Sequence, residues 1–141
     1  MIEVKNVKYN NQTKESIDFI RQTVFIEEQG ISADIEFDGK DTESTHAIIS
    51  QDGKAFGVGR ILKDGHIGRI AILKEYRAKG FGSKIVLSLI EEARNKSYNR
   101  VYLGSQKHAL DFYTKLGFTA FDDEYKVAGI SHQLMELILK K

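Results

Sequence analysis

Residues 77–82 combine an arginine, a lysine and two glycines in an order that could bind phosphate. The charged and glycine positions are Arg77, Lys79, Gly80 and Gly82, and the apolar run Ile70–Leu73 precedes them. The run predicts a strand, and a strand that turns into a helix aims backbone N–H groups and the positive end of the helix dipole at one point. The glycines would let a diphosphate approach the backbone closely. On its own, the pattern also fits a βα turn of any α/β protein.

A second chemical candidate is the hydroxyl of Tyr113, which lies in the segment Gln106–Phe118. A tyrosine, with an ordinary pKa of about 10, can donate a proton to a leaving group at neutral pH. The same segment also fits the end of a helix, with Gly117 as the left-handed residue and the next side chain turning into the core. Tyr113 could then be an aromatic residue at the edge of the core.

Composition narrows the class of protein. The 141 residues predict a single domain, residues 1–141, that is large enough to bury a core. A formal net charge of +1 gives no overall field for nucleic acid or an anionic membrane, so neither is expected as a partner. The chain has no cysteine, which excludes disulfides, cysteine zinc sites and cysteine nucleophiles, and no leader or membrane-spanning run is evident. We expect a cytoplasmic protein.

Hydrophobic periodicity predicts a mixed α+β fold in which helices connect and cover strands. Three antiparallel strands precede the phosphate-binding turn, and parallel character is expected where a helix links residue 73 to residue 101. The expected strands are 2–9, 46–50, 55–62, 66–73, 101–103, 118–127 and 132–139, the expected helices are 13–30, 80–97 and 107–116, and 32–44 is an acidic irregular loop.

Together, the two motifs resemble the signatures of the GNAT N-acetyltransferase superfamily. Its acyl-CoA loop has the pattern Arg/Gln-x-x-Gly-x-Gly/Ala, and its second signature pairs an apolar residue with a tyrosine before Gly-Phe. The resemblance implies a central, mostly antiparallel mixed sheet flanked by helices, in the order β-α-β-β-β-α-β-α-β-β. It implies transfer of an acetyl group from acetyl-CoA to a primary amine by direct attack in a ternary complex. A catalytically silent acyl-CoA-binding sensor is the alternative.

The resemblance also implies roles for individual residues. The strand at Ile70 would pair with the pantetheine arm and offer an N–H to the thioester oxygen, and Tyr113 would protonate the leaving thiolate. The cofactor-binding positions that the resemblance implies are Ile70, Ala71, Ile72, Arg77, Ala78, Lys79, Gly80, Phe81, Gly82, Ser83, Gln106, Phe112 and Tyr113. No metal is implied.

The outer segments resemble the ElaA-like subgroup of this superfamily. The matching segments are Val24–Gln29, Gly59–Leu62, Val101–Gln106 and Gly129–Met135. The subgroup usually has Gly-Ile-Pro-His in the last segment, where this chain has Ser131. The resemblance places the acceptor pocket among Phe25, Glu28, Gln29, Arg60 and His132.

The general base and the acceptor stay open at this stage. Glu28 is the first candidate for the base that deprotonates the amine, and a chain of water molecules is the alternative. The acceptor could be a small-molecule amine or a peptide amine. A homodimer is possible if the terminal strand Gln133–Leu139 pairs across two copies.

The acidic loop has two further interpretations. The order Asp34-x-Glu36-x-Asp38-Gly39 opens like an EF-hand loop, but its twelfth position is Thr45, so calcium binding is not expected. The loop could attract a cationic amine, or it could be solvated. The four histidines are scattered without metal-ligand spacing, which gives no support for metal catalysis.

Overall fold

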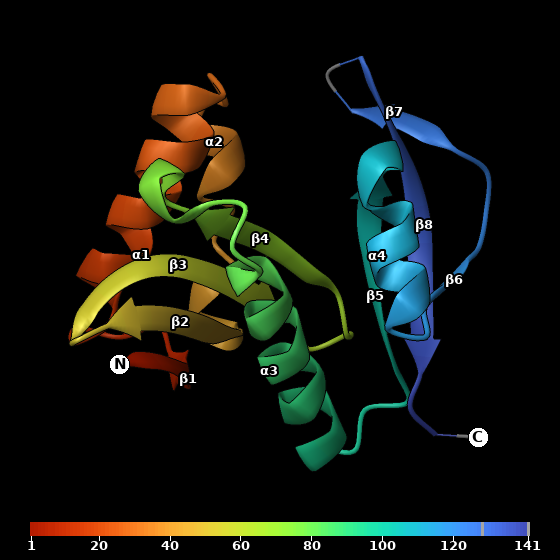
Figure 1. Cartoon of the computed structure of the whole chain (residues 1–141), viewed down its shortest axis with the longest axis horizontal. Coiled ribbons are helices and arrows are strands. Elements are labelled where there is room, and N and C mark those ends of the chain that lie inside the picture. Colours follow the sequence, from red (N-terminus) through yellow and green to blue (C-terminus); the bar gives the residue numbers. More distant parts are fainter. Residues whose placement is uncertain (128, 141) are drawn as a thin grey trace.

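The computed structural model describes residues 1–127 and 129–140, in which two sheets stand side by side and diverge (Figure 1). The first sheet has the order β1-β2-β3-β4, and the second has the order β5-β8-β6 with β7 also paired to β8. Between the sheets, the described residues contain one isolated parallel bridge, from His66 to Tyr102. The predicted parallel character is therefore confined to one end, and β4 and β5 separate beyond it.

The first sheet is antiparallel throughout, as predicted. Its strands are β1 (Ile2–Lys8), β2 (Thr45–Gln51), β3 (Lys54–Ile61) and β4 (Ile67–Ile72). The β2–β3 hairpin turns at Asp52 and Gly53, both with positive φ, which is the turn that matches the right-handed twist of paired strands.

Two helical segments cover opposite faces of this sheet. Helix α3 (Phe81–Asn95) packs on one face, so closely that a Cβ at Gly59 of β3 would collide with Ile85. Helix α1 (Lys14–Arg21) covers the other face with Ile17 and Ile20. Both faces of the sheet are thus covered. The edge of β4 faces the second sheet, and the pocket described below lies along this edge.

The predicted helix 13–30 changes character part-way. After α1 it continues as the π-helix η1 (Gln22–Glu28), and it stops where predicted, at Gly30 with φ +73°. Thr13 occupies the N-cap position, but its hydroxyl donates to the Lys8 carbonyl instead of capping the helix. Wider π turns are frequent at functional sites, and η1 borders the pocket described below.

The prediction of an irregular loop at 32–44 was wrong in part. The segment contains the short helix α2 (Ala33–Glu36) and the 3-10 turn η2 (Asp41–Glu43). The hydroxyl of Ser32 accepts a hydrogen bond from the Asp34 N–H and so caps α2.

The second sheet consists of β5 (Arg100–Gln106), β6 (Thr119–Ala120), β7 (Tyr125–Val127) and β8 (Ile130–Ile138). The prediction of one strand over 118–127 was wrong, because the chain turns at Asp122, where φ is +58°, and so divides it into two short strands. Helix α4 (Leu110–Lys115) packs beside β5, and the 3-10 turn η4 (Lys107–Ala109) that precedes it contacts β8. Since β8 lies between β5 and β6, it already has neighbours on both sides, and the homodimer stays a prediction.

A buried ionic cluster ties the 32–44 segment to the first sheet. Arg21 donates to Glu36 at 2.7 Å and to Asp41 at 2.6 Å, and Arg60 of β3 donates to Asp41 at 3.0 Å and to both carboxylate oxygens of Asp38. The hydrogen bonds from Arg60 hold the pKa of Asp38 well below its ordinary value. The acidic loop therefore turns these three carboxylates inward to arginines, and they are not free to attract a cationic acceptor.

We expect the stability of the fold to decrease as pH falls from about 7 to about 5. His46 is 1% exposed and its Nε2 donates to the Asp41 carbonyl at 3.0 Å, and burial lowers the pKa of this histidine and of His66. An unfolded histidine takes up a proton near pH 6.5, so below that pH the unfolded chain binds more protons than the folded chain does.

Urea unfolding at several pH values would measure this dependence. The variant His46→Gln keeps a donor near the position of Nε2 and should flatten the dependence, whereas His108→Gln, at an exposed position, should leave it unchanged. An equally steep dependence in His46→Gln would contradict the assignment.

Candidate active site

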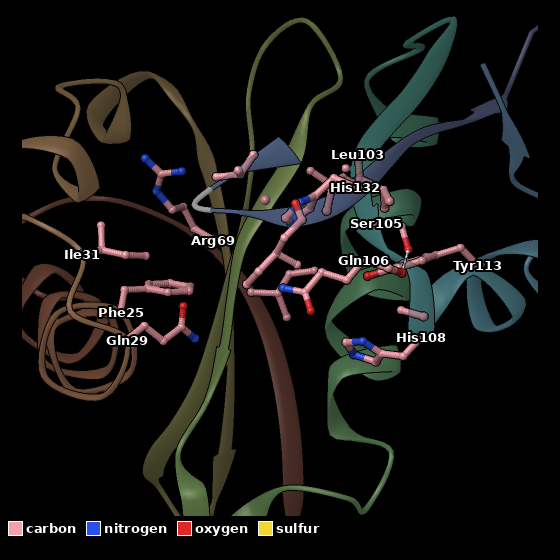
Figure 2. A pocket seen from close by; sticks show the side chains of 17 residues that line it. Phe25, Gln29, Ile31, Arg69, Leu103, Ser105, Gln106, His108, Tyr113 and His132 are labelled. Atoms are coloured by element: carbon pink, nitrogen blue, oxygen red, sulfur yellow. Dashed lines mark hydrogen bonds between the residues drawn. The ribbon is translucent and has the colours of Figure 1, made fainter. Parts of the chain in front are cut away.

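A pocket of about 700 Å³ lies where β4 and β5 diverge. Figure 2 shows Phe25, Gln29, Ile31 and Arg69 on one side of it and Gln106, His108, Tyr113 and His132 on the other. The remaining lining residues are Ile67, Gly68, Ile70, Leu103, Gly104, Ser105, Ala109, Val127 and Ile130. The pocket is thus mainly apolar, with a few polar side chains from both halves of the molecule.

A β-bulge shapes the β4 wall. Val58 of β3 pairs with Ala71, but Arg60 pairs with Gly68, so two residues of β4, Arg69 and Ile70, stand opposite one residue of β3. Arg69 has a φ of +53°, which is unusual for a residue with a side chain. Bulges recur beside active sites, because they interrupt the ladder and redirect backbone and side chains. Here the bulge lies at the centre of the pocket wall.

The predicted phosphate-binding turn opens helix α3. The chain passes through the 3-10 turn η3 (Lys74–Tyr76) and reaches Gly80, where φ is +81°, before the helix begins at Phe81. No atom lies within 4 Å of an ideal Cβ at Gly80 or Gly82, and the side chain of Lys79 is exposed. This is an open helix N-terminus with backbone donors and a nearby cation, so the chemistry of the turn fits a diphosphate.

The three predicted cofactor-binding residues of β4 have side chains in different surroundings. Ile70 lines the pocket, whereas Ala71 is buried against α1 and Ile72 packs into the core beneath α3. Ala71 can therefore offer a ligand only its backbone, and the side chain of Ile72 is partly buried. Residues 77–83 gather at the start of α3, outside the lining of the pocket.

Glu28 and Arg77 are paired with each other. The Nη2 of Arg77 lies 2.9 Å from Oε1 of Glu28, and its Nε donates to the Ile72 carbonyl at 2.8 Å. Glu28 is not among the residues that line the pocket. The structure therefore joins the predicted base to the predicted phosphate ligand, at the edge of the site.

Arg60, a predicted acceptor-side residue, lies elsewhere. It is 4% exposed and held by Asp38 and Asp41 in the buried cluster, away from the pocket lining. Its neighbour along the sheet, Arg69, lines the pocket instead and lies 3.2 Å from Glu36 and 3.3 Å from Asp38. Arg60 therefore lies outside the pocket, and it shares Asp38 with Arg69, which lines the pocket.

Tyr113 lies where a proton donor could serve the pocket, beside Ser105 and Gln106 in Figure 2. Burial raises the pKa of its hydroxyl above the ordinary value, so the hydroxyl carries its proton at neutral pH. Phe112, which was predicted to bind the cofactor, contacts the Tyr113 ring edge-to-face, with ring centroids 5.0 Å apart.

His132 and Gln106 face each other across the β5–β8 register, and both line the pocket. The strand continues through Ser131, which pairs with Lys126, so the position where the ElaA-like subgroup has proline stays within the ladder here. The structure therefore brings together Phe25, Gln29, Ile70, Gln106, Tyr113 and His132 of the predicted site residues.

Sequence reasoning missed several lining residues, among them Ile31, Arg69, His108, Val127 and Ile130. None belongs to a compact motif. The bulge that redirects Arg69 depends on register with β3, and the hairpin residues Val127 and Ile130 reach the pocket only because β7 folds back on β8. The sequence shows only that both are apolar; that Val127 is 52% exposed and Ile130 is 49% exposed is visible in the fold alone.

Comparison with known proteins gives the family. Residues 9–139 match the family described as Acetyltransferase (GNAT) domain. The chain belongs to the GNAT acetyltransferase family. A GNAT relative, the uncharacterized N-acetyltransferase YjcF of Bacillus subtilis, is 33% identical over 132 residues, which cover 91% of this chain and 94% of YjcF. As its family membership indicates, the chain is an acyltransferase.

Two solved GNAT-type structures match the fold. ElaA of Escherichia coli superposes with a TM-score of 0.86 at 24% identity, over 97% of this chain and 99% of ElaA. A GNAT family acetyltransferase from Elizabethkingia anophelis, solved with acetyl-CoA bound, has a TM-score of 0.73 at 17% identity and covers 98% of each chain. The predicted resemblance to ElaA-like GNAT proteins and the predicted fold class are confirmed.

Within residues 1–127 and 129–140, no helix is both long and apolar enough to cross a membrane. In the same ranges, no three His, Asp or Glu side chains come together in a way that could hold a metal ion.

Proposed function

We propose that this GNAT protein transfers an acetyl group from acetyl-CoA to a primary amine, by direct attack in a ternary complex. The observation that supports this most is the pocket at the divergence of β4 and β5, which has a bulged strand on one wall and a protonated tyrosine on the other. The open turn between β4 and α3 suits the diphosphate of the donor.

The division of tasks follows from the chemistry of aminolysis. The turn 77–83 would hold the diphosphate, and the backbone of β4 at Ile70–Ile72 would hold the pantetheine arm. An N–H at the bulge would stabilise the oxyanion that forms when nitrogen attacks the thioester carbonyl. Tyr113 would give its proton to the departing thiolate, because a hydroxyl that stays protonated is available when the C–S bond breaks.

The acceptor would enter from the side of η1 and the β7–β8 hairpin. Phe25, Gln29 and Ile31 border that side of the pocket, and His132 faces it from β8. A small-molecule amine is the acceptor class that we propose, because a pocket of about 700 Å³ has the size of small-molecule sites. The cytoplasmic location and the absence of nucleic-acid and membrane partners stay predictions.

Calorimetric titration with acetyl-CoA is the first test. We expect saturable binding with a Kd between about 1 and 100 μM, since KM values of enzymes for their substrates commonly lie in or near that range. A panel of primary amines, including an aralkylamine, a polyamine, an amino sugar and a short peptide, would then be screened for release of free CoA thiol.

The outcomes distinguish an active acetyltransferase from a catalytically silent acyl-CoA sensor. Absence of binding by folded protein would contradict the proposal. Binding without turnover on any amine of the panel would favour the catalytically silent acyl-CoA sensor.

A further inference from the structure

Direct attack by an amine requires a group that accepts the proton of the attacking nitrogen. Of the described residues that line the pocket, none carries a carboxylate. Glu28 is held by Arg77 at the edge of the site, at 2.9 Å. Arg69 stays protonated and cannot be a base. Tyr113 holds its own proton, because burial raises its pKa. Two histidines of the lining are left, His108 and His132.

A hydrogen bond distinguishes His132 from His108. Nδ1 of His132 lies 2.9 Å from the carbonyl oxygen of Ile130. A carbonyl only accepts, so Nδ1 must carry the hydrogen, and the neutral ring then has its lone pair on Nε2. His108 has no side-chain hydrogen bond to any residue that the structure describes, so nothing there selects its tautomer, and it lies on the exposed turn η4.

The surroundings also hold the His132 ring in place. Tyr125 of β7 stacks on it with ring centroids 5.6 Å apart. Gln106 stands opposite in the β5–β8 register. The other charged or titratable side chains that face the same pocket are Arg69, His108 and Tyr113. The ring is thus fixed from β7 and β8, and it projects into the space between the sheets (Figure 2).

We propose that His132 is the general base of the reaction and that its Nε2 accepts the proton of the attacking amine. This inference rests on the proposed acetyl transfer, and it assigns to His132 the role that sequence reasoning gave first to Glu28. The hydrogen bond from Nδ1 to Ile130 keeps Nε2 free for the acceptor and stabilises the imidazolium that forms.

The step balances in atoms and protons. The neutral amine attacks, a C–N bond forms, and one proton of the nitrogen passes to Nε2 of His132. The C–S bond breaks, and the thiolate sulfur takes the hydroxyl proton of Tyr113. Solvent then takes the extra proton from His132 and returns one to Tyr113, so the amide and the free thiol are the only net products.

The variant His132→Asn tests the assignment, because an asparagine amide can still donate to the Ile130 carbonyl but cannot act as a base. With phenethylamine as the acceptor, we expect kcat/KM to fall about 100-fold, within the range for a lost general base. The acidic limb of the pH–rate profile should also disappear. The Kd for acetyl-CoA should not change, and the matched variant His66→Asn, at a histidine that does not line the pocket, should retain both activity and acidic limb.

The outcomes separate this inference from the proposed function. If wild-type protein does not bind acetyl-CoA, the proposed function fails. If it binds and turns over, and His132→Asn keeps its rate and its acidic limb, only the role of His132 is overturned. A loss of acetyl-CoA affinity in His132→Asn would indicate a structural role and would also overturn it.

A second measurement needs no acceptor. Nitrogen-15 NMR of the histidine rings in the full chain reports the tautomer of each ring, and the His132 signals are those that the His132→Asn variant lacks. We expect hydrogen on Nδ1 and a free Nε2. The opposite tautomer in the presence of acetyl-CoA would overturn the proposal whatever the rate of turnover.

Discussion

Replacing Gly82 with aspartate should weaken acetyl-CoA binding by about 100- to 1,000-fold without unfolding the protein. Gly82 lies in the first turn of α3, where an ideal Cβ meets nothing within 4 Å, so the larger side chain fits. The new carboxylate would lie beside the proposed diphosphate position. Two like charges about 4 Å apart at an effective dielectric constant of about 20 repel by about 4 kcal/mol, which corresponds to about a thousandfold.

Stability should change in the opposite direction to affinity. An acidic residue in the first helical turn interacts favourably with the helix dipole, by about 0.3–1 kcal/mol. Thermal unfolding of Gly82→Asp should therefore match or exceed that of wild type, while calorimetry shows loss of binding. The control is Gly82→Asn, which has the same shape without the charge. Equal affinity for acetyl-CoA in wild type and Gly82→Asp would contradict the phosphate-site assignment.

Arg77 is a less informative position to mutate. Because Arg77 is bonded to Glu28 and to the Ile72 carbonyl, a change there alters the attachment of η1 to β4 together with any phosphate contact. The pairing also implies competition: an arginine bound to a carboxylate has fewer donors left for a diphosphate. Binding of the donor and the position of η1 are then coupled through one ion pair.

Local patterns were enough to predict most of the fold. The Asp52-Gly53 turn, the stop at Gly30 and the turn at Gly80 each depend on a few adjacent residues whose backbone preferences are strong. The alternating and helical periodicities placed the strands of the first sheet and helix α3 correctly, because these elements bury one face or both against a neighbour.

The features that sequence reasoning missed depend on contacts between distant residues. Arg60 was predicted on the acceptor side, but its partners Asp38 and Asp41 come from a segment that was expected to be irregular, and they hold it away from the pocket lining. The bulge at Arg69 arises from a shift in the pairing register between β3 and β4, and no residue type at that position predicts it. The tautomer of His132 depends on a carbonyl in the same hairpin, which only the folded backbone brings within 2.9 Å.

The substitution Tyr113→Phe should lower kcat by roughly 10- to 1,000-fold and leave the Kd for acetyl-CoA nearly unchanged, as for a lost general acid. The ring would keep its contacts with Phe112 and Phe118, since both involve the ring and not the hydroxyl. What is lost is the proton for the thiolate, so the interaction removed is one made in the transition state, and kcat and kcat/KM should fall together.

The control for this variant is Tyr102→Phe. Tyr102 lies on β5 in the same sheet, but its hydroxyl donates to Asp64 and it does not line the pocket. Its loss should leave kcat unchanged. Because burial holds the pKa of the Tyr113 hydroxyl above its ordinary value of about 10, wild-type activity should not fall on the alkaline side until pH exceeds that value.

An unchanged kcat in Tyr113→Phe would mean that the thiolate leaves without a protein donor. In that case, the pocket would contribute only orientation and the hydrogen bond to the oxyanion. The His132 variant would then be the more damaging of the two, because removal of the nitrogen's proton remains necessary whichever way the sulfur departs. Comparing the two variants at one pH therefore shows which of the two proton transfers depends more on its protein group.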